Sequence, residues 1–289
     1  FTGLSFDALR LTYATDLFTV DAVAAKLAET LGDFGEGDTD LYALYASYLG
    51  IEDVTLDAYW MYLRDDGVAL GDDVDVHTVG LRGAGTIGAF DFDVEVAYQF
   101  GDVDGRPSAC PFGFGEADVE YDAFAVNSEL GYTFDMTWMP RVFARFAWFG
   151  GGDDDNSLCS NDRDLPFNRL FSNWEYTEFF ANTDESNLFY YALGVGASPT
   201  EALALTLVCA YFEVDEEVPG SDDDSLGFEL GLYADYQYSE DLVFRAGYAH
   251  FFGDEGLEDN KFILNGLAAL GGDEDDDYDY LFIETELCF

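Results

Sequence analysis

The sequence predicts an all-β fold, an antiparallel transmembrane β-barrel. Three observations predict it: polar and apolar residues alternate along most of the chain, short and long connections take turns, and acidic and aromatic residues are both in excess. The 289 residues include 60 Asp and Glu against 11 Lys and Arg, a net charge of −49, yet 49% are hydrophobic and 17% aromatic. Disordered acidic chains are poor in aromatic residues, so we expect a folded sheet that sorts acids and aromatics onto different surfaces.

The alternation is clearest in residues 90–100, where Phe90 and Phe92 fall on one face of a strand and Asp91 and Asp93 on the other. Each segment of this kind has roughly the ten residues that a tilted barrel strand requires. No run approaches the roughly 18–20 apolar residues of a transmembrane helix. We predict about thirteen strands, at residues 4–13, 18–28, 41–49, 54–64, 77–86, 90–100, 122–133, 140–149, 187–197, 202–212, 226–237, 242–252 and 278–289.

The connections between these segments alternate in length without exception. The short ones are residues 14–17, 50–53, 87–89, 134–139, 198–201 and 238–241. The long ones, crowded with Asp, Glu and Gly, are residues 29–40, 65–76, 101–121, 150–186, 213–225 and 253–277. Bacterial barrels have short periplasmic turns at one rim and long extracellular loops at the other. We therefore expect a location in the bacterial outer membrane, with short periplasmic turns and long acidic extracellular loops.

The last predicted strand follows a long loop, which places the C-terminus in the periplasm. Phe289, Leu287, Ile283 and Leu281 share one face of this strand. A terminal aromatic residue behind alternating apolar residues resembles the C-terminal signature of outer-membrane barrels. Bacterial barrels have an even number of strands, so thirteen cannot close one. We expect residues 1–289 to form a single barrel domain that lacks its N-terminal strands, about one, three or five of them, which gives roughly 14, 16 or 18 strands in the complete barrel.

The polar faces of the predicted strands carry most of the few cations. An arginine that faced lipid at the bilayer midplane would cost about 2–4 kcal/mol, whereas a wet interior removes most of that penalty. We therefore expect the apolar faces to meet lipid and the polar faces to line a pore. The predicted pore-lining residues are Arg10, Asp21, Asp57, Arg82, Asp91, Asp93, Glu95, Glu129, Arg141, Arg145, Glu229, Asp235, Arg245, Glu284 and Glu286.

Small residues also occur on the predicted inner faces. A barrel of this size is not filled by side chains when many of them are small, so they favour a channel over a plugged interior. The small inward residues are Gly80, Gly131, Gly194, Gly196 and Gly231.

The inward arginines and carboxylates have two interpretations, an ion-pair network that stiffens the wall or a transverse field that orients polar solutes. Because rings of charge set pore selectivity, the carboxylate excess predicts a preference for cations. The leading hypothesis is a passive channel for small polar solutes, ions or saccharides. The alternatives are an export or uptake pore for one polysaccharide, and a structural barrel that sheathes another component. Tyr45 and Tyr59 are candidate stacking residues for a saccharide.

Other chemistry has little support in the sequence. His77 and His250 stand alone and no Gly-x-Ser-x-Gly motif occurs, so we expect no enzyme. The acidity disfavours nucleic acid, whose phosphates need clustered Lys and Arg. We expect membrane lipid and lipopolysaccharide as partners, and leave monomer or trimer open. A short helix is expected at residues 260–270, which either narrows the pore or caps the rim.

The four cysteines show no metal-ligand spacing, so no metal site and no cofactor are predicted. Cys110 and Cys159 lie in long loops at the same rim and are the candidate disulfide. Cys209 and Cys288 lie on apolar faces. Acidic runs at the same rim have two interpretations: a solvated, repelling surface suited to salty water, or carboxylates that bind Ca²⁺ or Mg²⁺ and bridge lipopolysaccharide phosphates. These runs are residues 153–155, 222–224 and 273–277.

Several segments, taken in order, resemble the alginate-export family of outer-membrane porin-like barrels. They are residues 6–13, 18–26, 40–48, 56–66 and 77–82, and the loop 166–171 that leads into 186–188. The resemblance implies a monomeric barrel of about 18 strands, and so about five strands before Phe1. It also implies passage of a polyanionic polysaccharide through an arginine-rich lumen. The carboxylates that surround the arginines here would repel a polyuronate, so the resemblance supports the barrel and a passive pore more than that substrate.

Overall fold

The computed structural model describes residues 7–30, 37–66, 73–104, 118–152, 162–170, 186–217, 221, 223–260 and 277–287. The described residues form fourteen strands and one short helix. The strands are β1 (Asp7–Ala14), β2 (Phe18–Thr30), β3 (Gly37–Ile51), β4 (Val54–Asp65), β5 (Asp73–Ile87), β6 (Phe90–Asp104), β7 (Asp118–Thr133), β8 (Arg141–Phe149), β9 (Asp162–Leu165), β10 (Leu188–Thr200), β11 (Leu203–Val214), β12 (Ser225–Ser239), β13 (Leu242–Gly253) and β14 (Tyr278–Leu287). The helix is α1 (Glu255–Asn260).

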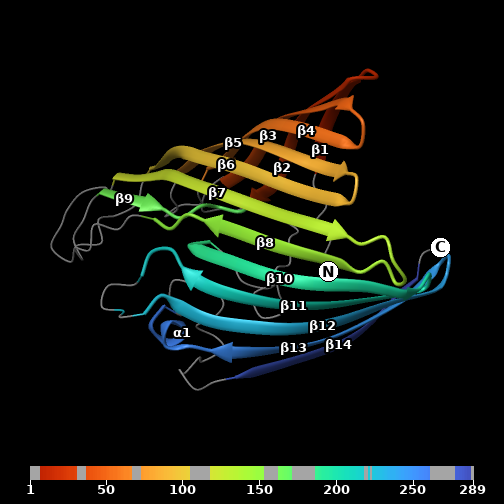
Figure 1. Cartoon of the computed structure of the whole chain (residues 1–289). Helices are drawn as coiled ribbons and strands as arrows, with labels where there is room; N and C mark the ends of the chain where they lie inside the picture. The colour runs from red at the N-terminus through yellow and green to blue at the C-terminus, as the bar shows by residue number, and fades with distance from the viewer. Residues whose placement is uncertain are drawn as a thin grey trace. The chain divides into compact units, whose positions relative to one another are not determined.

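Strands that follow one another in the chain are neighbours in the sheet (Figure 1). The order runs from β1 to β8 and then from β10 to β14, and the described registers along it are antiparallel. β9 lies off this path and pairs in parallel with the start of β7. Within the described ranges, no helix has the length and apolar composition of a membrane span.

The chain divides into two compact units. Unit 1 comprises Phe1–Gly85, Val94–Val126 and Gly150–Asn168, and unit 2 comprises Thr86–Asp93, Asn127–Phe149 and Arg169–Phe289. Each unit is described by itself below.

The thirteen predicted strands are confirmed, and so is the alternation of short turns and long connections. Several strands extend further than predicted at the long-connection end. β5, for example, begins at Asp73 rather than at residue 77, and its Val74 and Asp75 pair with Asp65 and Arg64 of β4.

Two predictions between residues 150 and 277 change. An uninterrupted loop over residues 150–186 is wrong, since β9 lies within it. The four residues of β9 are too few to show alternation, and Pro166 ends the segment. The helix begins at Glu255, five residues before the predicted 260–270, most of which lies outside the described residues.

The two faces of the strands differ as the alternation predicts. On the apolar face, Leu81, Leu193 and Ile283 are 67%, 70% and 79% exposed. On the opposite face, which we call the polar face, Ala192 is 4% exposed although it adjoins Leu193. Large apolar side chains exposed on one face only are what a barrel wall presents to lipid.

Aromatic rings gather on the apolar face near the two ends of the strands. At the long-connection end of unit 1, the ring of His77 lies between Tyr62 and Phe100, with centroids 4.5 and 5.1 Å away. In unit 2, Tyr191 contacts Phe146 at the same end, with centroids 5.4 Å apart. At the short-turn end, further ring pairs are Phe18–Tyr48 in unit 1, and Phe90–Tyr132 and Tyr238–Phe244 in unit 2. Such rows match the aromatic girdles at membrane interfaces.

Each unit also has a buried region on its polar face at the long-connection end. In unit 1, Gln99 is fully buried, and its Nε2 donates to the Asn168 carbonyl at 2.7 Å and to Thr78 Oγ1 at 3.0 Å. The Asn168 amide donates back to Gln99 Oε1 at 2.7 Å. Gln99 therefore anchors the segment after β9 over the polar face.

In unit 2, the corresponding region is built from apolar side chains. Tyr190, Phe212 and Phe251 are at most 1% exposed, and their rings contact one another across three strands. α1 lies beside the start of β12 (Figure 1), and its Leu257 is 1% exposed. The helix thus packs against the start of β12, at the long-connection end of the strand.

Candidate functional site

The strand registers gather the fifteen predicted site residues into local groups on the polar face. The described pairs bring inward positions of neighbouring strands together, such as Asp57 opposite Arg82 and Asp235 opposite Arg245. Opposite charges directly across a strand pair attract each other at short range. As a result, each of the five predicted arginines forms an ion pair with at least one of the predicted carboxylates.

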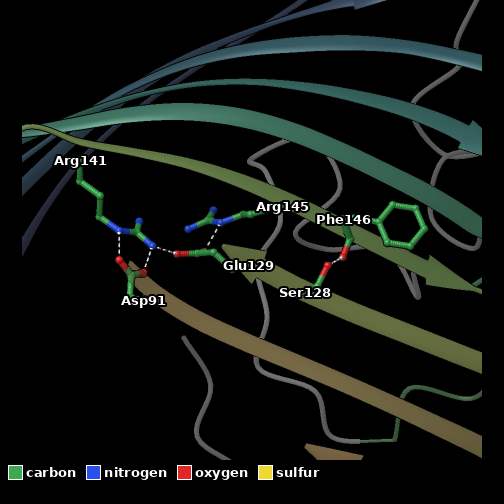
Figure 2. Close-up of polar contacts among 6 residues, drawn as sticks. All are labelled: Asp91, Ser128, Glu129, Arg141, Arg145 and Phe146. Atoms are coloured by element: carbon green, nitrogen blue, oxygen red, sulfur yellow. Dashed lines mark hydrogen bonds and ion pairs between the residues drawn. The ribbon is translucent and has the colours of Figure 1, made fainter. Parts of the chain in front are cut away.

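The largest group, in unit 2, joins Asp91 of β6, Glu129 of β7, and Arg141 and Arg145 of β8. Figure 2 shows Glu129 between the two arginines, with Oε1 accepting from Arg141 Nη2 at 2.6 Å and Oε2 from Arg145 Nε at 2.5 Å. Arg141 also binds Asp91 through both Nε, at 3.1 Å, and Nη2. One carboxylate therefore bridges two guanidinium groups, and a second carboxylate completes the charge balance.

Phe143 holds the two guanidinium groups apart. Alternation places it on the same face as Arg141 and Arg145, and the Cζ atom of each arginine lies 4.8 Å from the Phe143 ring centroid. Arginine over an aromatic face is a favourable arrangement. The ring itself occupies the space above Gly194, its partner on β10, where a Cβ atom would overlap it. Our sequence analysis missed Phe143, although its position two residues from each arginine carries the signal.

A second group in unit 2 surrounds Arg245 of β13. Its Nη2 lies 2.8 Å from Glu286, its Nη1 lies 3.3 Å from Glu284, and its Nε lies 3.3 Å from Asp235. Arg245 is 39% exposed and the three carboxylates are 46–55% exposed. Three carboxylates around one arginine leave this part of the polar face negatively charged.

In unit 1, two more of the predicted arginines form ion pairs with predicted carboxylates. Arg10 of β1 binds Asp21 of β2 through Nε at 2.8 Å and Nη2 at 2.7 Å, and Thr12 donates to the same carboxylate. Arg82 of β5 donates from Nη1 to Asp57 Oδ2 of β4 at 3.3 Å. The side chain of Asp57 is only 3% exposed, so this carboxylate faces neighbouring side chains rather than open solvent.

Tyr59 and Glu95 lie next to the Asp57–Arg82 pair. The Tyr59 hydroxyl donates to Glu95 Oε1 at 2.5 Å. The rings of Tyr45 and Tyr59 are parallel within 2°, with centroids 5.7 Å apart. The two candidate stacking residues thus form one aromatic platform.

Neighbouring side chains lie over most of the inward glycines. The Tyr59 ring lies over Gly80, the Asp91–Arg141 pair lies over Gly131, and the Tyr233 ring lies beside Gly231. A Cβ atom at Gly196 would make only ordinary van der Waals contacts, the nearest at 3.7 Å. Cross-strand register decides which side chain covers each glycine.

Some of the remaining predicted residues lie within the described residues, and others lie outside them. Asp93 lies on the polar face of β6, and Glu229 of β12 is 2% exposed. Cys209 is free and exposed on the apolar face. The candidate disulfide Cys110–Cys159, Cys288 and most of the acidic runs proposed to bind divalent cations lie outside the described residues.

Comparison with known proteins places this wall in a family. The sequence matches the alginate export family over residues 1–260. A comparison with curated protein sequences gives no match.

Solved structures with a similar fold are outer-membrane proteins. The siderophore receptor PirA from Pseudomonas aeruginosa aligns with a TM-score of 0.53 and 12% identity over 85% of this chain and 40% of the receptor. OccK11 (OpdR) and OccK8 (OprE) from the same organism each align with a TM-score of 0.54, at 12% and 14% identity, over 98% of this chain and 71% of theirs. This chain thus spans about 40% of the length of the receptor. The fold is that of an antiparallel transmembrane β-barrel of the bacterial outer membrane, and the chain belongs to the alginate export family.

Proposed function

We propose that the polar face lines a passive aqueous channel for small polar solutes, and that this channel favours cations. The observation that carries the proposal is the pairing of the arginines. Each of the five predicted arginines is bound by carboxylates, and the same set of residues contains ten carboxylates.

Paired arginines contribute little net positive potential to the water in front of them. The surplus carboxylates, such as the three around Arg245, then determine the sign of the local field. A passage lined by one sign of charge concentrates counter-ions and excludes co-ions. Membership of the alginate export family and the likeness to OccK porins support a channel role.

The test is the reversal potential of single channels in planar bilayers under a KCl gradient. We expect a potential of the sign set by K⁺, and a weaker preference at high salt because surface charge is screened. Glu284→Gln with Glu286→Gln should shift the potential toward zero, whereas Thr206→Ser, a neutral change on the same face of β11, should not. An anion preference would refute the proposal, and a protein that never conducts would support the structural barrel instead.

Passage of a polysaccharide such as alginate is the second candidate, and the family match favours it. A polyuronate needs unpaired cations along its path, and the described arginines of the set are already bound by carboxylates. Oligouronates should therefore block the K⁺ current no better than neutral oligosaccharides of equal length. Selective block by oligouronates would favour the polysaccharide pore.

A further inference from the structure

The polar face of unit 1 carries an aromatic platform with acids at both of its edges. Tyr45 of β3 and Tyr59 of β4 stand directly opposite each other in the register, and their rings are parallel within 2°. Both side chains are partly exposed. The two stacked rings therefore offer a partly exposed apolar surface between acidic side chains.

The sequence builds this platform through Gly80. Tyr59 is paired with Gly80 on β5, where a Cβ atom would overlap the Tyr59 ring. The ring leans over the glycine, and its hydroxyl then reaches Glu95 of β6 at 2.5 Å. The Tyr45 hydroxyl interacts with the Asp57 carboxylate on β4. Both tyrosines thus direct their hydroxyl groups to carboxylates, which leaves the ring faces rich in electrons.

The two acids at the platform are incompletely neutralised. Asp57 Oδ2 accepts from Arg82, but Oδ1 is buried without a hydrogen-bond partner. Glu95 accepts from the Tyr59 hydroxyl and, within the described part of the chain, forms no ion pair. A buried carboxylate oxygen without a partner is costly, so the platform favours any ligand that supplies positive charge nearby.

We propose that Tyr45, Tyr59, Asp57 and Glu95 form a binding subsite for organic cations of the alkylammonium or quaternary ammonium type. Electron-rich ring faces attract such cations, and the two carboxylates complement their charge. K⁺ and Na⁺ fit less well, because ring faces supply no oxygen ligands to replace their hydration shells. Anionic solutes are repelled by the same carboxylates. The subsite deepens the proposed cation-favouring channel by naming the class of solute that pauses in it, and it rests on that function for its biological role.

Equilibrium binding of tetramethylammonium to the purified protein in detergent tests the subsite. Saturation-transfer NMR would report ring contact, and a titration would give the dissociation constant. Tyr59→Leu and Glu95→Gln should each weaken binding about fivefold or more, as expected for the loss of a cation–π contact or a neighbouring charge. Tyr59→Phe should retain most of the affinity because the ring face remains. Glu52→Gln, which removes an exposed carboxylate from the short turn between β3 and β4 of the same unit, is the matched control and should leave binding unchanged.

The outcomes separate this proposal from the channel. A cation-selective current with no tetramethylammonium binding would overturn the subsite and leave the channel standing. Binding that Tyr59→Leu weakens, in a protein that does not conduct, would support the subsite and refute the channel. Equal affinity for maltotriose that Glu95→Gln leaves unchanged would overturn the cation assignment in favour of a neutral saccharide. Tetramethylammonium binding that neither Tyr59→Leu nor Glu95→Gln alters would also overturn it.

Discussion

The replacement of Glu129 by glutamine tests the charged group of Figure 2. Glu129 bridges Arg141 and Arg145 through separate oxygens, at 2.6 and 2.5 Å. Glutamine keeps one carbonyl oxygen for one guanidinium group and turns an amide N–H toward the other. The substitution therefore removes one charge-assisted hydrogen bond and places a donor against a donor.

The magnitude follows from burial. Glu129 is 17% exposed and its two arginines are 26% and 27% exposed, so solvent compensates little for the loss. A hydrogen bond to a charged group contributes about 1.5–3 kcal/mol, and removing one partner of a fully buried pair costs about 3–5 kcal/mol. We expect Glu129→Gln to lower the free energy of unfolding by about 2–3 kcal/mol. Glu286→Gln is the control, because its group is more exposed and Arg245 keeps two other carboxylates, so a loss below about 1 kcal/mol is expected.

Urea unfolding in detergent micelles, followed by tryptophan fluorescence, measures both variants. The midpoint should fall for Glu129→Gln while the slope stays unchanged, since the surface exposed on unfolding is the same. The reversal potential should also move toward anions, because Arg141 and Arg145 would retain fewer carboxylates. If Glu129→Gln loses no more stability than Glu286→Gln, the bridge is not a structural element and the reasoning fails.

Three further predictions test the space above the glycines, the Gln99 anchor and the assignment of the two faces. Gly194→Ala should destabilise the barrel by about 1–3 kcal/mol, since its Cβ would overlap Phe143, whereas Gly196→Ala has room at 3.7 Å and should be nearly neutral in the same urea assay. Gln99→Leu should leave the backbone of Asn168 without its partners and accelerate amide hydrogen exchange there, and unchanged exchange would show that the anchor is unnecessary. Leu207→Arg, on the apolar face of β11, should reduce stability by about 2–4 kcal/mol in lipid vesicles, while Thr206→Arg, on the polar face, should cost far less; equal losses would contradict the assignment of faces.

The strands and their faces were predictable because alternation is written directly in the residues. Leu193 and Ala192 lie on opposite faces because they are adjacent in a strand, and the thirteen long strands follow from the same alternation. The strand ends were less predictable, since residues outside the predicted segments, such as Val74 and Asp75, still pair with the neighbouring strand. β9 escaped prediction because backbone pairing with β7, rather than any periodicity of its side chains, defines it.

The candidate site was predictable as a set of residues but not as a set of contacts. The alternation of polar and apolar residues predicted that Arg141 and Glu129 both lie on the polar face. The partnership of Arg141 with Asp91, fifty positions away, depends on the pairing of strands and on register. The same is true of Gly80, because only the register places the Tyr59 ring above it.

The rings that lie over glycines have a consequence for how the sheet selects its pairing. Alternation penalises a slip by one residue, which turns every side chain to the wrong face, but it tolerates a slip by two. After such a slip, Tyr59 would meet Thr78 or Arg82 instead of Gly80, and Phe282 would meet Arg245 or Ala249 instead of Gly247. Neither ring would then lie opposite a glycine, so a side chain would occupy the space that the ring fills in the observed register. These ring–glycine pairs therefore favour the observed register over one shifted by two residues. The Leu and Val side chains that face lipid fit either register and do not distinguish them.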